Sequence, residues 1–354
     1  MDIGEIFDLY YNEHMHKGIS QCSGISLLSF CVGVGVTYLF LQTIPNSQEL
    51  LKPVRESSIP YGSQGTLTDP LINITSVAPN SPEYSALQST IQSYIDSQKE
   101  NGLISAAVQL RDFNNVTGFV INPDEKYYPA SLYKVFLMIT YFKMAQDNPS
   151  ILDTVIHYSG SKDLDSREEI KSAVQLTPNT DYTVNQLIQH MIRYSDNNAL
   201  RVLTDNLTNE QSHMYLQVFG DLNIDPSTVD QQIDSLKVGG YATVLAALYN
   251  ASYLDRTYSE RALLLLTETD FTEGIESGIP NGVIVAQKFG EAQIQTNNAI
   301  VGKQLSNCGI VYYPHHPYRL CIMLKGSGDH IKFLEGVLSG ISRIVYKDME
   351  NRYP

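Results

Sequence analysis

Three short clusters of polar residues have the types and spacing that covalent catalysis needs. In the first, Ser131-Leu132-Tyr133-Lys134, a serine and a lysine lie three residues apart, after Pro129 and before the apolar run 135–142. Residues with this separation face each other on a helix. An unaided hydroxyl is a poor nucleophile, whereas a desolvated lysine loses its charge more readily and can accept the hydroxyl proton. The first cluster therefore predicts an activated serine.

The other two clusters are Ser195-Asp196-Asn197 and Lys288-Phe289-Gly290. The former separates two amphipathic stretches, which places it at a corner between helices where Asp196 would cap the second helix. The latter ends a strand-like run. Each cluster alone has an ordinary explanation, since Ser131 could cap a helix, Lys134 could extend its ammonium to solvent, and serine, aspartate and asparagine are common in turns. The three together, in this order, favour a catalytic site.

The ordered triplet S-x-x-K, S-D-N and K-x-G resembles that of class A β-lactamases and their penicillin-binding relatives. The similarity covers the chain from about residue 82 to 350. The resemblance implies that Ser131 is the nucleophile, that Lys134 accepts or relays its proton, and that Ser195 passes a proton to the leaving nitrogen. The implied substrate is a β-lactam or a D-amino-acid peptide, attacked through an acyl-enzyme without a metal or other cofactor.

The resemblance also implies a set of substrate-binding residues. Asn197 would hold the lysine and the amide side chain of the substrate, and Lys288 would add positive potential near the substrate carboxylate. The oxyanion hole would consist of two backbone N–H groups, those of Ser131 and of Glu291, the residue after Gly290.

Two features depart from the family pattern. Efficient class A enzymes carry a glutamate on a loop after S-D-N that activates the deacylating water, but between Asn197 and Ala242 the only glutamate is Glu210, outside the loop-like stretch 219–240. Phe289 stands where the family has threonine or serine, so a hydroxyl for the substrate carboxylate is lost and the cleft is narrowed. We therefore expect slow deacylation and weaker or relocated carboxylate recognition. The stretch 219–240 offers only aspartates, namely Asp221, Asp225, Asp230 and Asp234.

The elements that must position these clusters do not alternate as β-α-β units. Strand-like runs occur at both ends of the domain, and a mostly helical stretch lies between them. The pattern predicts an α+β fold with an antiparallel sheet built from both ends, flanked by helices, and an inserted helical subdomain. The expected elements are a helix over 82–99, strands over 104–110, 116–121, 282–290, 308–313 and 319–325, and a closing helix over 330–346.

The N-terminal residues predict a membrane anchor. No charged residue occurs over 18–44, and Ile25 to Leu41 is strongly apolar and near the minimum length for a transmembrane helix. A cleaved signal peptide fits less well, because the preceding region is long and acidic and no small-residue cleavage site follows. We expect residues 1–17 to be a cytoplasmic tail, 18–44 a single-pass anchor, 45–80 a linker that adds nothing to the core, and 81–350 the hydrolase domain.

The net charge and the spacing of cysteines and histidines argue against nucleic acids and metal ions as binding partners. The 354-residue chain has a net charge of −14 and no basic patch, which argues against nucleic-acid binding. The histidines and cysteines lack metal-ligand spacing. Cys308 and Cys321 could lie on adjacent strands, and we expect buried free thiols there. The charges that flank the anchor do not set its orientation, so the chemistry of the site decides for an extracytoplasmic domain.

The sequence leaves two classes of function open. The first is a membrane-anchored serine hydrolase that opens β-lactams or cleaves D-peptides of the cell-wall type. The second is a sensor or wall-binding protein that becomes acylated but barely turns over. The missing glutamate favours the second class over a fast β-lactamase, whereas the complete nucleophile set argues against an inactive fold.

Overall fold

A computed structural model of the chain describes residues 67–69, 80–160, 164, 169–172, 174–228, 233–296, 299–328 and 331–354. All of them belong to one compact unit, Lys52–Pro354. The expected tail 1–17 and anchor 18–44 lie outside these residues. Within the described ranges no helix is long and apolar enough to cross a membrane, so the anchor stays a prediction.

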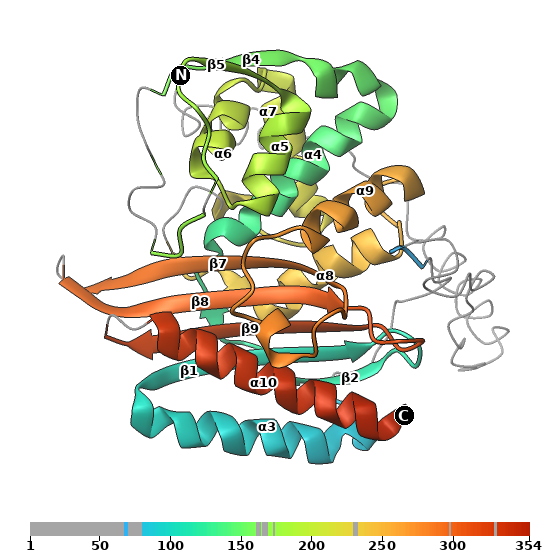
Figure 1. Ribbon diagram of the computed structural model, residues 1–354, viewed down its shortest axis with the longest axis vertical. Helices are drawn as coiled ribbons and strands as arrows, with labels where there is room; N and C mark the ends of the chain where they lie inside the picture. The colour runs from blue at the N-terminus through green and yellow to red at the C-terminus, as the bar shows by residue number, and fades with distance from the viewer. Residues whose placement is uncertain are drawn as a thin grey trace, which may run out of the picture. The chain divides into compact units, whose positions relative to one another are not determined.

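Both ends of the domain contribute strands to one antiparallel sheet (Figure 1). The strand order is β2-β1-β9-β8-β7, and β1 joins the two halves through its pairing with β9, in which Val108 faces Ile322. This confirms the antiparallel sheet expected from the strand-like runs. The strands are β1 (Leu103–Asp112), β2 (Thr117–Ile121), β7 (Val285–Thr296), β8 (Ala299–Val311) and β9 (Tyr318–Ser327).

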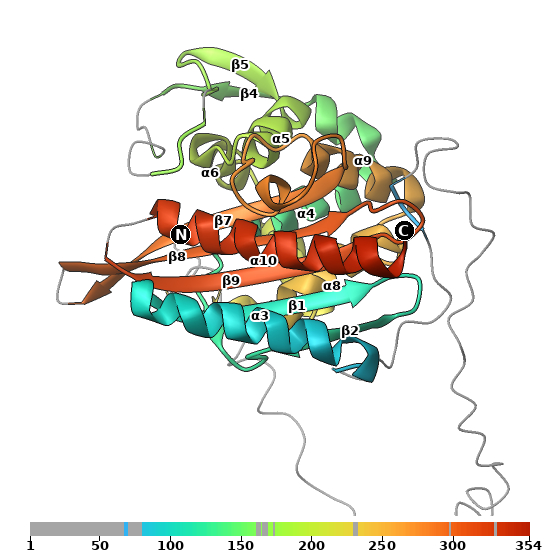
Figure 2. The same ribbon diagram turned by 60° about the horizontal axis from the view of Figure 1, so that its bottom comes forward.

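Helices cover both faces of the sheet. On one face lie α3 (Ser85–Gln98) and α10 (Ile331–Arg352), side by side in both views (Figures 1 and 2). The buried residues of α3 are Leu87, Ile91 and Ile95, which recur at the four-residue spacing of one helix face. On the other face, α8 (Val238–Tyr249) packs against β1, β8 and β9.

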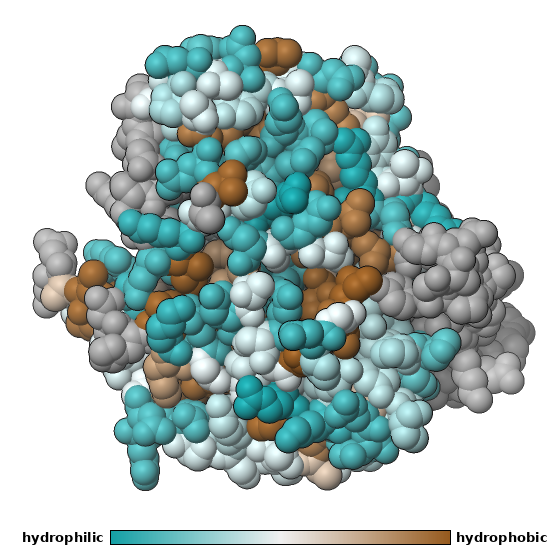
Figure 3. All heavy atoms as spheres, in the orientation of Figure 1, coloured by the Kyte–Doolittle hydropathy of each residue, from teal (hydrophilic) through white to brown (hydrophobic). Residues whose placement is uncertain are grey.

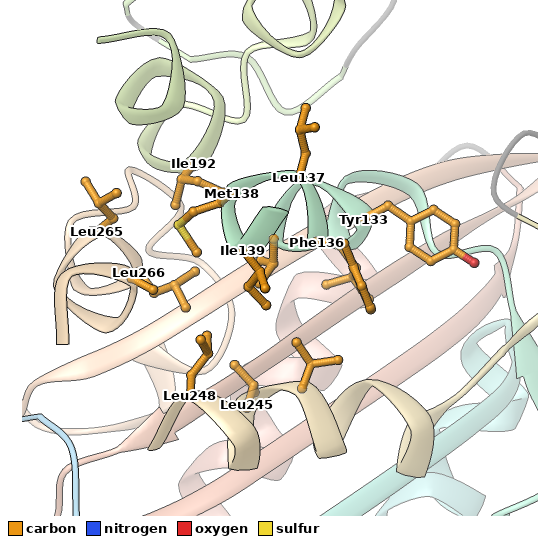
Figure 4. Packing of buried hydrophobic residues seen from close by; sticks show 14 of the residues in the cluster. Tyr133, Phe136, Leu137, Met138, Ile139, Ile192, Leu245, Leu248, Leu265 and Leu266 are labelled. Atoms are coloured by element: carbon orange, nitrogen blue, oxygen red, sulfur yellow. The ribbon is translucent and has the colours of Figure 1, made fainter. Parts of the chain in front are cut away.

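The helical subdomain is inserted between β2 and β7. Its central helix is α4 (Lys134–Asp147), which is buried on nearly every side, as expected of a helix that is apolar all round. Figure 4 shows Phe136 and Ile139 of α4 above Leu245 and Leu248 of α8. The remaining helices are α5 (Val184–Arg193), α6 (Asn197–Asp205), α7 (Asn209–Asp221) and α9 (Arg256–Thr267).

Short elements complete the described chain. Two small antiparallel ladders pair β3 (Lys126–Tyr127) with β6 (Leu236–Lys237) and β4 (Val155–Tyr158) with β5 (Thr180–Thr183). Single 3-10 turns are η1 (Pro82–Tyr84), η2 (Lys99–Asn101), η3 (Ala130–Tyr133), η4 (Pro149–Asp153), η6 (Pro226–Thr228) and η7 (Glu276–Gly278).

The β7–β8 hairpin is longer than the sequence indicated. The strand expected over 282–290 continues to Thr296, and β8 begins at Ala299 instead of near residue 308. The additional part carries many polar residues and lacks the continuous apolar run used to identify strands. It projects from the sheet, with Ile300 and Val301 each 44% exposed, and apolar side chains, coloured brown, are visible at this end in Figure 3.

Cys308 and Cys321 form a disulfide between β8 and β9, so the expectation of free thiols was wrong. The two residues are direct cross-strand partners in the register of the sheet, an arrangement that brings their Cβ atoms close together. The strands could be located from the sequence, but the register that aligns these two cysteines could not.

Three residues of the expected linker pack on the domain. The N–H groups of Leu67 and Thr68 donate to the carboxylate of Glu260 in α9, at 2.5 and 2.9 Å. The N–H of Asp69 donates to the carbonyl oxygen of Tyr249 at 2.8 Å, and the side chain of Leu67 is buried in the core. The expectation that the linker adds nothing to the core therefore fails for these three residues.

Candidate active site

Ser131 lies in a sharp turn that leads directly into α4. The preceding residue, Ala130, has φ 47°, a left-handed conformation that is uncommon for a residue with a Cβ. The N–H of Leu132 donates to the carbonyl oxygen of Pro129 at 3.0 Å and closes the turn. This geometry leaves Ser131 partly exposed at the start of a buried helix, where it lines a surface hollow.

Lys134 is the first residue of α4 and is only 1% exposed. Its ammonium donates to the backbone carbonyl oxygen of Ser195 and, at 3.2 Å, to the Ser195 hydroxyl. Lys134 thus connects the turn of Ser131 to the corner between α5 and α6. A solvent-directed lysine, the ordinary explanation for this residue, is incompatible with this burial.

Ser195 occupies that corner and has φ 53°. Its hydroxyl accepts a second hydrogen bond, at 2.9 Å, from the ammonium of Lys288 on β7. Lys288 is fully buried and also donates to the carbonyl oxygen of Phe289 at 3.3 Å. Three segments far apart in the sequence therefore converge on one hydroxyl, as the order of the three clusters predicted.

Asp196 caps α6 as predicted, because its carboxylate accepts a 2.8 Å hydrogen bond from the N–H of Ala199. Its other oxygen lies 3.6 Å from Nδ1 of His190, which is ion-pair distance and longer than a hydrogen bond. Burial alone would raise the pKa of this carboxyl. The attraction of His190, the N–H of Ala199 and the charge of Lys134 outweigh burial and hold the pKa below its usual value.

Gly290 lets β7 approach the turn of Ser131 closely. A Cβ at this position would lie 2.9 Å from the carbonyl oxygen of Pro129 and 3.2 Å from the backbone nitrogen of Ser131. A Cβ contact of 2.9 Å with a backbone oxygen is shorter than real ones, so this close approach of the two backbones needs a glycine. Glu291 follows on β7, an edge strand of the sheet, which is where the expected oxyanion hole needs its second N–H group.

Asn197 begins α6 directly after the corner, where its side chain is partly buried. Its predicted roles toward the lysine and the substrate amide stay predictions. Phe289 lines the same hollow as Ser131 and Ser195. Its ring stacks on Phe271 with the centroids 4.3 Å apart, so an aromatic wall stands where the family has a hydroxyl.

No carboxylate from the stretch 219–240 lines the hollow in the part of the chain that the structure describes. Asp221 accepts a hydrogen bond from the Tyr253 hydroxyl at 2.8 Å, and Asp234 pairs with Lys325 at 2.9 Å. Asp230 lies outside the described residues. The described lining residues are Ser131, Ile170, Lys171, Ser172, Val174, Gln175, Tyr194, Ser195, Asp196 and Phe289.

Sequence reasoning missed one wall of the hollow, which comes from residues 170–172, 174 and 175. Neither helical nor strand periodicity marks this segment, and it carries no catalytic motif. Its position depends on side chains elsewhere in the chain, chiefly Glu291, whose carboxylate accepts hydrogen bonds from the N–H groups of Glu169 and Ile170 at 2.7 and 3.2 Å. These partners lie more than 120 residues away in the sequence, so no local pattern could have indicated them.

Comparison with solved structures shows the same fold. PBP-A aligns over 78% of this chain and 100% of its own length, with a TM-score of 0.62 and 21% identity. A class A β-lactamase from Mycobacterium abscessus aligns over 75% of this chain and 99% of its own, with a TM-score of 0.60 and 19% identity. A PBP-A variant solved as an acyl-enzyme complex with penicillin G aligns with a TM-score of 0.62 and 20% identity, over 78% of this chain and 100% of its own.

A search of curated proteins gives no match. The model of the β-lactamase enzyme family, in contrast, matches residues 86–349, which include all three sequence clusters. This match spans most of the chain and agrees with the resemblance drawn from the order of the clusters. The chain belongs to the β-lactamase enzyme family.

Proposed function

We propose that this protein opens β-lactam amides through an acyl-enzyme on Ser131 and releases the acyl group slowly. The observation that carries the proposal is the Ser195 hydroxyl, which accepts hydrogen bonds from two buried lysines, Lys134 and Lys288, beside the hollow that Ser131 lines. Burying two amines around one hydroxyl lowers the stability of the fold, and ionisable groups buried at such a cost are typical of functional sites. The acyl-enzyme complex of the PBP-A variant with penicillin G supports the same chemistry for this fold.

Each residue of the cluster has a step in this reaction. The Ser131 oxygen attacks the lactam carbonyl carbon, and its proton passes to the amine of Lys134, which is buried close to a second buried lysine, Lys288. The carbonyl oxygen becomes an oxyanion that the N–H groups of Ser131 and Glu291 would stabilise. The carbon–nitrogen bond then breaks, and the lactam nitrogen receives a proton from the Ser195 hydroxyl, which Lys134 replenishes.

Deacylation requires a water molecule and a base to activate it. Asp196 is the one carboxylate among the described lining residues, and it is engaged as the cap of α6. Its low pKa also makes it a weak base. This favours a lasting acyl-enzyme, as in a slow β-lactamase or a D,D-peptidase acting on cell-wall peptides. A sensor that forms the acyl adduct without turnover is the second candidate, supported by the same observation.

The proposal includes a location outside the cytoplasm, on a single-pass anchor formed by residues 18–44. β-Lactams and cell-wall peptides are met outside the cytoplasm. The Cys308–Cys321 disulfide supports this location, because disulfides persist mainly in oxidising compartments.

The test follows the intact mass of the protein during incubation with penicillin G. We expect a one-to-one adduct that maps to Ser131 and decays slowly, and no adduct on the Ser131→Ala variant. A rapidly lost adduct with product release would instead identify an efficient hydrolase, and a permanent adduct would identify the sensor. Labelling that survives in Ser131→Ala would show that the catalytic assignment is wrong.

A further inference from the structure

Lys288 is unsuited to holding a substrate carboxylate in this protein. Its side chain is fully buried. Its ammonium is engaged by the Ser195 hydroxyl at 2.9 Å and by the carbonyl oxygen of Phe289 at 3.3 Å. The face of the Phe289 ring lies 4.4 Å from the same ammonium, a favourable cation–π distance. The Lys288 ammonium is therefore buried behind the ring of Phe289. A substrate carboxylate in the hollow would need a different cationic side chain as its partner.

Residues 170–172 line the hollow, and with Glu169 before them they form a segment, 169–172, that two sets of side-chain contacts, here called clasps, hold in place. We call this segment the strap. In the first clasp, the Glu291 carboxylate accepts hydrogen bonds from the N–H groups of Glu169 and Ile170, at 2.7 and 3.2 Å. In the second, the ammonium of Lys303 on β8 lies 2.5 Å from the Glu169 carboxylate. Lys303 is only 6% exposed, so this ion pair is screened less than a surface pair.

The strap carries a lysine at the mouth of the hollow. Lys171 lines the hollow together with Ser131, Ser195 and Phe289, and it is exposed to solvent. It makes no ion pair with any residue within the described ranges. Its side chain is accessible at the hollow, whereas those of Lys134 and Lys288 are buried.

We propose that Lys171 binds the carboxylate that β-lactams carry beside the lactam nitrogen, in place of the contact that Phe289 removes. This inference rests on the proposed function, since it specifies the substrate group that the same site recognises. Glu291 is a positioning residue for Lys171, because its carboxylate binds the backbone N–H groups that precede Lys171. The backbone N–H of Glu291 belongs to the expected oxyanion hole. Recognition of the anion has thus moved from the edge strand to the strap.

The test compares two ligands that differ only in this charge, penicillin G and its methyl ester, by their second-order rate constants for acylation of Ser131. In the wild-type protein we expect the acid to react faster than the ester by about tenfold, the effect of one charge-assisted contact. In Lys171→Met the rate with the acid should fall by about tenfold while the rate with the ester stays unchanged. Lys171→Arg should restore the preference for the acid.

Two further variants separate a local contact from a general effect of charge. Lys347→Met removes the same charge from an exposed position of α10, on the opposite face of the sheet from α8, and should leave the ratio of the two rates unchanged. Glu291→Gln weakens the first clasp and should reduce the ratio of the two rates.

The outcomes distinguish this inference from the proposed function. If Lys171→Met keeps the wild-type ratio, Lys171 does not bind the carboxylate and the inference is wrong, although acylation of Ser131 stands. If Lys347→Met lowers the ratio as much, the effect is one of net charge and the inference is equally wrong. If neither ligand acylates the wild-type protein, the proposed function itself fails.

Discussion

At the scale of residues, Lys134 connects Ser131, the proposed nucleophile, to Ser195, the proposed proton donor. It follows Ser131 by one helical turn, and its ammonium reaches both the hydroxyl and the carbonyl oxygen of Ser195. Lys134→Met keeps the length and apolar stem of the side chain but removes the base. We expect acylation by penicillin G to slow by about 10²–10⁴-fold, as is typical of a lost general base, measured as the rate of adduct formation.

Lys143→Met is the matched control, because it makes the same change in the same helix. The Lys143 ammonium contacts the carbonyl oxygen of Tyr253, outside the hollow. Its loss should leave the acylation rate within about twofold, as expected for a residue without a part in the reaction. An unchanged rate in Lys134→Met at neutral pH would mean that another group activates Ser131.

The three motifs that converge in the structure could be located from the sequence, because each motif is local and their order is specific. The strap could not be assigned, because its position depends on Glu291 and Lys303, which belong to strands far along the chain. The actual bond of Lys134 to the Ser195 backbone was also beyond sequence reasoning. Ser195 makes this contact from a left-handed backbone conformation, φ 53°, which residue type alone does not indicate.

At the scale of elements, the corner between α5 and α6 depends on the Asp196 cap. The pKa of its carboxyl lies below the usual value, so the charged form stabilises the folded state. This contribution is fully present above the unfolded pKa, about 3.9, and is lost as the pH falls through the lower folded pKa. Asp196→Asn keeps a capping oxygen but removes the charge. We expect it to lower the free energy of unfolding at pH 7 by about 1–3 kcal/mol.

The pH dependence is the discriminating measurement. Chemical unfolding of the wild type and of Asp196→Asn should give free energies that converge as the pH is lowered below about 4. Asp255→Asn is the control, because Asp255 caps α9 in the same way but is exposed, and its effect should be only a few tenths of a kcal/mol. A stability difference for Asp196→Asn that persists unchanged at acidic pH would contradict the role given to its charge.

Elements that bury an apolar stripe were predictable, as α3 and α10 show. The outer half of the β7–β8 hairpin was not, because its strands are held by backbone pairing beyond the apolar core. The disulfide depended on the same pairing, since one residue of register shift would separate Cys308 from Cys321.

At the scale of the whole molecule, the proposed chemistry of the site and the disulfide both favour a location outside the cytoplasm. The substrates proposed for Ser131 occur outside the cytoplasm, where a disulfide such as Cys308–Cys321 would persist because no reducing thiol pool is present. If the protein is exported and the disulfide forms, Cys308 and Cys321 should resist a thiol-blocking reagent when the protein is isolated from membranes and unfolded. Both cysteines should become modified only after reduction, as measured by mass spectrometry of their peptides.

The orientation of the chain in the membrane follows from the same reasoning. With residues 1–17 inside and 25–41 crossing the bilayer, the domain that contains Ser131 should be accessible from outside. An external protease added to intact cells should therefore release the domain and leave a short membrane-bound fragment, while a cytoplasmic marker protein stays intact. Fluorescent penicillin that does not cross the membrane should label Ser131 in the same cells. A domain that is protected from protease until the cells are lysed, with the marker then cleaved alongside it, would place the domain in the cytoplasm and contradict both the orientation and the compartment inferred from the disulfide.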